Sequence, residues 1–245
     1  MKVLMVYVFL LLFAPLANAG GEFVSYQVNG KAYQGYFVSP SSEAPLILLV
    51  HDWDGLTDYE VKRANMLADL GYSVFAADLF GEGVRPTEVK DKRQHTGELY
   101  KDRAKMRALM TSALDTAVLK GANGGNAIAM GYCFGGAAVL EYARSGADLK
   151  GFVTFHGGLE TPVGQDYKQT RGKLLILHGS ADKNITMDQY AALATELELN
   201  QISHEMISYG GAPHAFTVFG SKAYRADADK KSWSRFIVYL QETLK

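Results

Sequence analysis

The chain has 245 residues, with 25 lysines and arginines against 26 aspartates and glutamates, and a formal net charge of −1. This balance gives no basic excess that would attract nucleic acid or an anionic membrane surface, so neither is expected as a partner. The single cysteine excludes an internal disulfide.

The first 19 residues have the pattern of a secretory signal peptide. Lys2 precedes an apolar run over residues 3–13, and residues 17–19 read Ala-Asn-Ala, a typical cleavage site. An uncleaved membrane anchor is the alternative, but the run is short for a membrane span. We therefore expect export to the periplasm or the medium, with residues 20–245 as a single domain that keeps no stable membrane association.

The rest of the chain begins with a predicted hairpin and continues as alternating strands and helices. Alternating apolar residues over 22–38 flank Asn29-Gly30, which is a strong signal for an antiparallel pair. Strands are then predicted at 46–50, 72–77, 127–130, 151–155, 174–177 and 202–209, and helices at 58–70, 98–120, 136–144, 187–199 and 227–244. This order predicts an α/β fold: a mostly parallel central sheet with an antiparallel N-terminal hairpin and helices on both faces.

Two stretches are predicted to lie outside regular structure. Residues 81–97 are polar and are expected to form either an exposed excursion or part of a lid over the site. Residues 123–126 are rich in glycine and are expected to form a turn.

The strongest motif is Gly131-Tyr-Cys133-Phe-Gly135, at the end of a predicted strand. It has the Gly-x-nucleophile-x-Gly spacing of a nucleophile elbow, with cysteine in place of serine. The glycines let a strand turn sharply into a helix, and the helix N-terminus favours a thiolate. A buried, inert cysteine is the alternative, and the flanking glycines argue against it.

An acid and a histidine follow Cys133 in the order that α/β-hydrolases use, at the ends of later strands. We expect Asp182 to orient His214, and His214 to act as the base for the thiol. His204 and Asp188 are competing candidates, but they lie inside a predicted strand and a predicted helix. The expected site contains no metal.

Backbone N–H groups are expected to complete the site. The residue after the nucleophile, Phe134, and Trp53 in the loop after residues 46–50 are the candidates for an oxyanion hole. Trp53 could instead be a packed side chain, and His156 could equally line the pocket or form a turn.

Together these motifs resemble the dienelactone hydrolase family. The matching segments are the cysteine elbow and residues 51–56 (His-Asp-Trp-Asp-Gly-Leu), 77–81 (Ala-Asp-Leu-Phe-Gly), 178–182 (His-Gly-Ser-Ala-Asp) and 211–216 (Gly-Ala-Pro-His-Ala-Phe). The resemblance covers residues 22–245. It implies an α/β-hydrolase fold with a Cys-His-Asp triad that hydrolyses lactones or small esters without a cofactor.

The loop at residues 51–56 departs from the family pattern. The resemblance places Asp52 where the family has a glutamate that holds the resting thiol, and the shorter side chain predicts a looser contact or none. Asp54 replaces a second aromatic residue and would disfavour an anionic substrate. Arg85 and Arg93 are only loosely positioned candidates for the arginines that bind a substrate carboxylate in the family's type enzyme. His156 and Phe216 are further candidates for lining the substrate site.

The sequence thus predicts a monomeric cysteine-dependent hydrolase of a small ester or lactone, acting through a thioester intermediate. A non-catalytic exported binding protein that keeps the fold is the alternative. A redox thiol protein is weaker, because the chain has no resolving cysteine.

Overall fold

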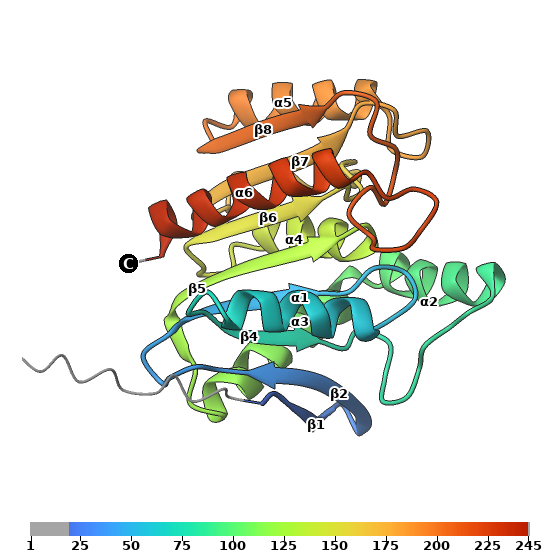
Figure 1. The fold of residues 1–245 in the computed structure, drawn as a ribbon. Helices are drawn as coiled ribbons and strands as arrows, with labels where there is room; N and C mark the ends of the chain where they lie inside the picture. Colours follow the sequence, from blue (N-terminus) through green and yellow to red (C-terminus); the bar gives the residue numbers. More distant parts are fainter. Residues whose placement is uncertain (1–19, 245) are drawn as a thin grey trace, which may run out of the picture.

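The computed structural model describes residues 20–244, so the predicted signal peptide lies outside the described residues. These residues form one eight-stranded sheet in the order β1-β2-β4-β3-β5-β6-β7-β8, with helices packed against it (Figure 1). No helix within 20–244 combines the length and apolar character needed to cross a membrane.

The elements follow the predicted alternation. The strands are β1 (Glu22–Val28), β2 (Lys31–Val38), β3 (Pro45–Val50), β4 (Ser73–Ala77), β5 (Asn123–Tyr132), β6 (Gly151–Phe155), β7 (Lys173–Gly179) and β8 (His204–Tyr209). The helices are α1 (Asp58–Ala68), α2 (Val89–Lys101), α3 (Arg103–Leu119), α4 (Phe134–Arg144), α5 (Met187–Leu199) and α6 (Ala226–Thr243).

The sheet has an antiparallel end and a parallel body. β1 pairs with β2, and β2 with β4, in antiparallel register, whereas the other five pairs are parallel. Asn29 and Gly30 join β1 to β2 with φ angles of 50° and 77°, as a two-residue hairpin turn requires. The predicted mostly parallel sheet with a front hairpin is confirmed.

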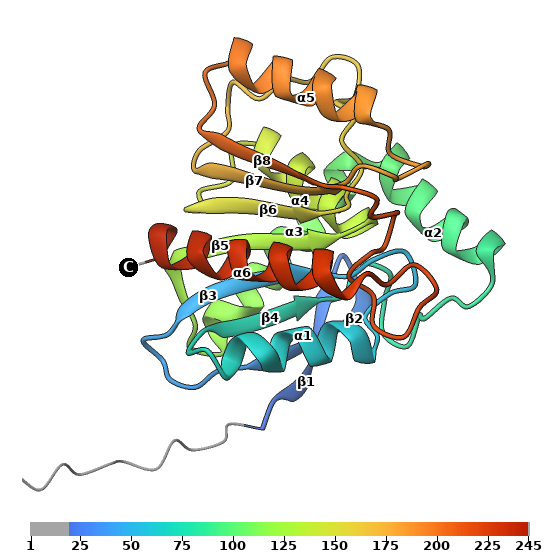
Figure 2. The ribbon, with the colours of Figure 1, turned by 45° about the horizontal axis from the view of Figure 1, so that its top comes forward.

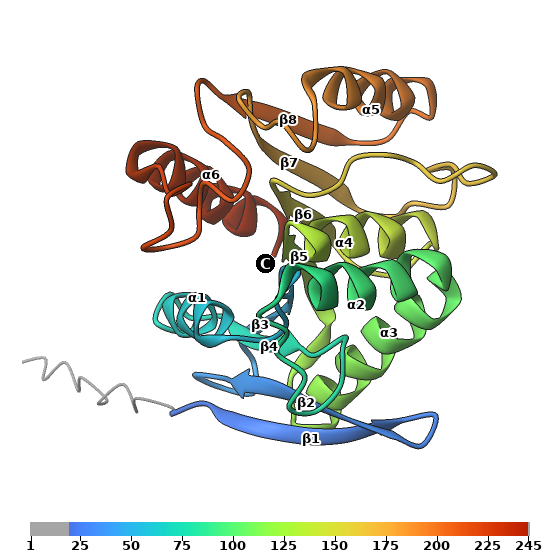
Figure 3. The same cartoon turned by 90° about the vertical axis from the view of Figure 1, so that its right-hand side faces the viewer.

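Helices cover both faces of the sheet. α1 and α6 lie on one face, and α2 to α5 lie on the other (Figures 2 and 3). A separate apolar core fills each interface: Leu67 and Phe236 belong to the core under α1 and α6, and Met110 and Leu140 to the core under α3 and α4. The sheet is therefore buried on both sides, which explains why its central strands read as continuous apolar runs.

Two segments differ from the prediction because local capping and pairing override the sequence pattern. The stretch 81–97 contains the start of α2, and the predicted helix 98–120 is broken at Asp102, which has φ −114° and ψ 77°. The Asp102 side chain accepts a hydrogen bond from the N–H of Lys105 at 2.9 Å and so begins α3. Residues 123–126 extend β5 instead of forming a turn, with a register shift opposite Pro45.

Candidate active site

Polar side chains gather at one edge of the sheet. β3, β5 and β6 end next to Asp52, Cys133 and His156, and the loops after β7 and β8 carry Asp182 and His214. Because these strands are parallel, their carboxyl ends meet at the same edge, where open α/β sheets bind ligands.

The elbow between β5 and α4 holds Cys133 in a strained backbone conformation. Its φ is 50° and its ψ is −112°, and its N–H donates to the carbonyl of Phe155 at 3.1 Å. A Cβ on Gly131 would lie 2.3 Å from backbone atoms of Gly135, and one on Gly135 would lie 2.4 Å from the carbonyl oxygens of Val50 and His51. Only glycine fits at these two positions, because any side chain there would clash with the backbone where β5 turns into α4.

His214 lies between Cys133 and Asp182. Its Nε2 is 3.1 Å from the Cys133 sulfur, and its Nδ1 is 2.7 Å from Oδ2 of Asp182. The other carboxylate oxygen of Asp182 accepts hydrogen bonds from the N–H groups of Asn184 and Ile185 at 2.8 and 2.9 Å. The three side chains that the sequence analysis selected are therefore in contact, in the expected order.

The electrostatics of this group favour a charged histidine. Burial alone would lower the pKa of His214, but the contacts with Asp182 and Cys133 raise it to about 10. Burial would raise the pKa of Asp182, yet the hydrogen bonds from His214, Ile185 and Asn184 outweigh burial and lower it. An ionised Asp182 beside an imidazolium is the arrangement that stabilises a neighbouring thiolate.

The two competing candidates lie elsewhere. His204 is at the start of β8, where its Nδ1 contacts the carbonyl of Ile202 at 2.8 Å and its Nε2 lies 3.8 Å from Glu198. That is the opposite end of the strand from the loop that carries His214. Asp188 lies in the first turn of α5.

Of the two N–H groups predicted for an oxyanion hole, that of Phe134 lies at the elbow itself. Phe134 is the first residue of α4, where an N–H has no acceptor within the helix. Trp53 is half-buried in the loop after β3 and packs against the same core cluster as Cys133. The ammonium group of Lys92 lies 5.2 Å from the Trp53 ring, so the tryptophan is also part of a packed contact.

Asp52 is held by its own loop. Its Oδ1 accepts a hydrogen bond from the N–H of Asp54 at 3.0 Å, and its described contacts include no hydrogen bond to Cys133. Burial, the side-chain carboxyl of Asp54 and nearby Glu60 and Cys133 raise the pKa of Asp52 to about 10. This direction favours the neutral form of the Asp52 side chain, which places less negative charge beside the thiol.

Asp54 was expected to place a negative charge near the site that disfavours an anionic substrate, but in the structure it is paired with a lysine. Lys92 of α2 lies 3.4 Å from Oδ2 of Asp54 and compensates its charge. Arg85 donates to the carbonyl of Val84 at 2.8 Å and lies 3.8 Å from buried Asp78. The sequence does not mark Lys92, because the polar residues around it lack the apolar periodicity that indicates a helix.

His156 and Phe216 lie behind His214. Both are fully buried, which differs from the expectation that they line the substrate site. The His156 ring is 5.3 Å from the His214 ring and 5.5 Å from the Phe216 ring, between centroids. Close packing of the loop after β8 against β6 leaves these side chains no accessible surface.

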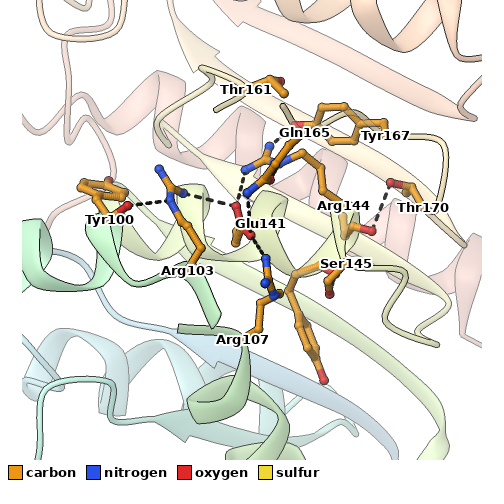
Figure 4. Close-up of polar contacts among 12 residues, drawn as sticks. Tyr100, Arg103, Arg107, Glu141, Arg144, Ser145, Thr161, Gln165, Tyr167 and Thr170 are labelled. Carbon is orange, nitrogen blue, oxygen red and sulfur yellow. Dashed lines mark hydrogen bonds and ion pairs between the residues drawn. The ribbon is translucent and has the colours of Figure 1, made fainter. Parts of the chain in front are cut away.

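Two adjoining cavities lie on the α4 side of this sheet edge, and neither lining includes Cys133, Asp182 or His214. The smaller, of about 230 Å³, is lined by Tyr100, Ala137 and Ile185 among others, and the larger, of about 720 Å³, runs toward α5. Arg103 borders both cavities and also reaches buried Glu141 (Figure 4). Tyr100 and Arg103 were not singled out from the sequence, because a helical pattern does not distinguish a cavity-facing residue from a solvent-facing one.

Within residues 20–244, no group of three or more histidine, cysteine, aspartate or glutamate side chains is arranged to hold a metal ion.

Residues 33–244 match the family described as "Dienelactone hydrolase family". The chain belongs to the dienelactone hydrolase family. It is therefore a hydrolase of the dienelactone hydrolase type, and the fold and resemblance predicted from the sequence are confirmed.

Named relatives and solved structures agree with this assignment. A Bradyrhizobium sp protein named "Probable 2-oxo-3-(5-oxofuran-2-ylidene)propanoate lactonase" is 24% identical over 90% of this chain and 93% of its own length. The structure titled "m3DLH" is 30% identical, covers 94% of this chain and 100% of its own, and superposes with a TM-score of 0.87. A dienelactone hydrolase-like promiscuous phosphotriesterase, P91, from metagenomic libraries is 29% identical over 92% of this chain and 99% of its own, with a TM-score of 0.85.

Proposed function

We propose that this chain hydrolyses a small carboxylic ester or lactone with Cys133 as nucleophile, His214 as base and Asp182 as the orienting acid. The observation that carries the proposal is the 3.1 Å contact between the Cys133 sulfur and Nε2 of His214, whose other ring nitrogen contacts Asp182. Membership of the dienelactone hydrolase family supports the reaction class.

The first half-reaction forms a thioester. His214 holds on Nε2 the proton that the Cys133 thiol has lost, and the resulting thiolate attacks the carbonyl carbon of the substrate. The N–H groups of Phe134 and Trp53 stabilise the tetrahedral oxyanion. The carbon–oxygen bond to the alcohol then breaks, and His214 gives its proton to the departing alkoxide. Asp182 accepts the Nδ1–H of His214 throughout and stabilises the imidazolium.

The second half-reaction releases the acid. His214, now neutral, takes a proton from a water molecule as that water attacks the thioester carbonyl. The tetrahedral intermediate collapses, the carbon–sulfur bond breaks, and Cys133 leaves as a thiolate beside the imidazolium. Each step uses only the substrate, water and side chains of this chain.

The substrate class follows from the family and from the cavities. A relative is named for lactone hydrolysis, and the cavity of about 230 Å³ that Ala137 lines, just beyond the elbow, is the nearer space for part of a small substrate. We further propose that the enzyme works without a cofactor, as a monomer, after export and cleavage of residues 1–19.

Hydrolysis of p-nitrophenyl acetate and a lactone panel by wild type, Cys133→Ala and Cys133→Ser tests the nucleophile. We expect kcat/KM of the alanine variant to fall by more than about a thousandfold, because no other side chain can form the acyl intermediate. Because Cys133 is the chain's only cysteine, iodoacetamide should abolish activity at one label per chain. Turnover that survives in Cys133→Ala would contradict the proposal.

The same panel separates an enzyme from a binding protein. A protein that only binds would turn over no ester, and Cys133 would react with iodoacetamide at the rate of an ordinary thiol.

A further inference from the structure

Buried His156 packs directly behind His214 and takes no part in the proposed chemistry. His156 is fully buried, and its φ of 42° is unusual for a residue other than glycine. Its ring meets that of His214 at 66°, with centroids 5.3 Å apart. The strained backbone and the burial of His156 together fix the position of its ring against His214.

A chain of hydroxyl groups leads from His156 to an arginine. Nε2 of His156 is 2.8 Å from Oγ1 of Thr217, which is 2.8 Å from the Tyr59 hydroxyl, and Nε of Arg63 donates to that hydroxyl at 3.3 Å. Arginine can only donate. One order gives each hydroxyl one bond to accept and one to donate: Arg63 donates to Tyr59, Tyr59 to Thr217, and Thr217 to Nε2 of His156. In that order Nε2 is an acceptor and the ring carries its proton on Nδ1.

Arg63 is a firm starting point for this chain. Its side chain is 1% exposed and pairs with Asp229 of α6 at 2.5 Å. It also donates to the backbone carbonyl of Thr217 at 2.9 Å, so it holds the loop that carries His214 directly as well as through Tyr59.

Burial is the main reason why the pKa of His156 lies well below the ordinary value. Among the facing groups, His214 and His178 lower this pKa further and Asp182 raises it. From β5 the ring faces only the Tyr132 phenol, with centroids 5.9 Å apart.

We propose that Tyr59 is a positioning residue that, through Thr217, fixes His156 as a neutral acceptor, so that no second positive charge lies against the His214 imidazolium. The inference rests on the proposed pairing of His214 with Cys133, and it adds a regulatory contact to that site. The 5.3 Å separation of the two rings is short enough for like charges to repel strongly. A charged His156 would disfavour the imidazolium, and with it the reactive thiolate.

Alkylation of Cys133 by iodoacetamide tests this inference without an ester substrate, because the thiolate is the reacting form. In Tyr59→Phe the Thr217 hydroxyl is free to rotate and to accept a hydrogen bond from a protonated Nε2 of His156. We expect the alkylation rate to match wild type at alkaline pH and to fall about three- to tenfold below it toward the acid end of the range, because the variant offers a protonated His156 an acceptor that wild type withholds. The acid limb of the pH profile of kcat/KM should correspondingly move to higher pH than in wild type.

Matched variants separate this effect from loss of packing. Tyr36→Phe removes another tyrosine hydroxyl that bonds to α1, at 2.9 Å from Asn65, and should leave the pH profile unchanged. The double variant Tyr59→Phe/His156→Gln should return the acid limb to that of wild type, because glutamine cannot take a charge. Thr217→Ala, which leaves the Arg63 contact to the backbone carbonyl intact, should shift the limb as Tyr59→Phe does if the latter folds poorly.

Two outcomes would overturn the inference while leaving the hydrolase proposal standing: a wild-type pH profile in folded Tyr59→Phe, or a shift that persists in the double variant. Ester turnover that survives Cys133→Ala would instead defeat the proposed function itself.

Discussion

Asp182 uses both carboxylate oxygens, one on the His214 ring and one on two backbone N–H groups. Asp182→Asn should therefore keep the loop in place but lower kcat by about 10³- to 10⁴-fold, because an amide cannot stabilise the imidazolium. Steady-state ester hydrolysis measures this, with exposed Asp227→Asn on α6 as the control that keeps wild-type kcat. A loss of less than about tenfold in folded Asp182→Asn would remove Asp182 from the proposed triad.

Asp52 makes a second residue-scale prediction, through pH. Its pKa of about 10 in the folded chain lies far above the ordinary value of about 3.9. Above about pH 4 the unfolded chain therefore ionises Asp52 while the folded chain does not, and stability falls as pH rises toward 10. Asp52→Asn avoids this loss. It should be more stable than wild type at about pH 8, with the difference shrinking as pH falls toward 4.

Urea unfolding across that pH range measures the effect. Exposed Asp69→Asn serves as the control and should change the free energy of unfolding by less than about 0.5 kcal/mol. A variant Asp52→Asn that is less stable than wild type at alkaline pH would show that the carboxyl is ionised in the folded state.

The sequence was informative about residues in motifs and silent about residues that meet only through tertiary packing. Cys133, Asp182 and His214 could be selected because glycine spacing and strand ends carry that information locally. The contact between Tyr59 and Thr217 joins residues 158 positions apart, and no local pattern marks either of them.

At the scale of elements, the apolar strands were predictable and polar helix α2 was not. α2 buries only Thr96 and Leu99, so it has almost no apolar stripe to reveal its period. The break between α2 and α3 depends on the cap at Asp102, which a continuous helical pattern conceals.

The elbow makes an element-scale prediction. Gly135→Ala would place a Cβ 2.4 Å from two backbone oxygens of the β3 end, which cannot move without displacing the central sheet. We expect the free energy of unfolding to fall by more than about 3 kcal/mol. Gly97→Ala is the matched control, because nothing lies within 4 Å of its Cβ in α2, and alanine there should stabilise by up to about 1 kcal/mol. Equal effects of the two changes on urea unfolding would contradict this account of the elbow.

At the scale of the whole molecule, one buried carboxylate joins several segments on the α3–α4 face. Glu141 of α4 is fully buried and contacts Arg103 and Arg107 of α3, and Arg144 of its own helix (Figure 4). Gln165 from the segment after β6 donates to it at 3.2 Å. Arg103 and Arg144 of the cluster also line the smaller cavity, so the cluster fixes where Arg103 borders it.

Glu141→Gln keeps the shape of this side chain but leaves three guanidinium groups without a carboxylate. We expect the free energy of unfolding to fall by about 3–5 kcal/mol, since removing one partner of a buried ion pair leaves uncompensated charge. Glu242→Gln is the control: it removes a half-exposed carboxylate 3.0 Å from Arg235 and should cost less than about 1 kcal/mol. Urea unfolding at neutral pH compares the two. A loss at Glu141 as small as that at Glu242 would mean that solvent already screens the arginines, and that Glu141 is not what holds α3, α4 and the segment after β6 together.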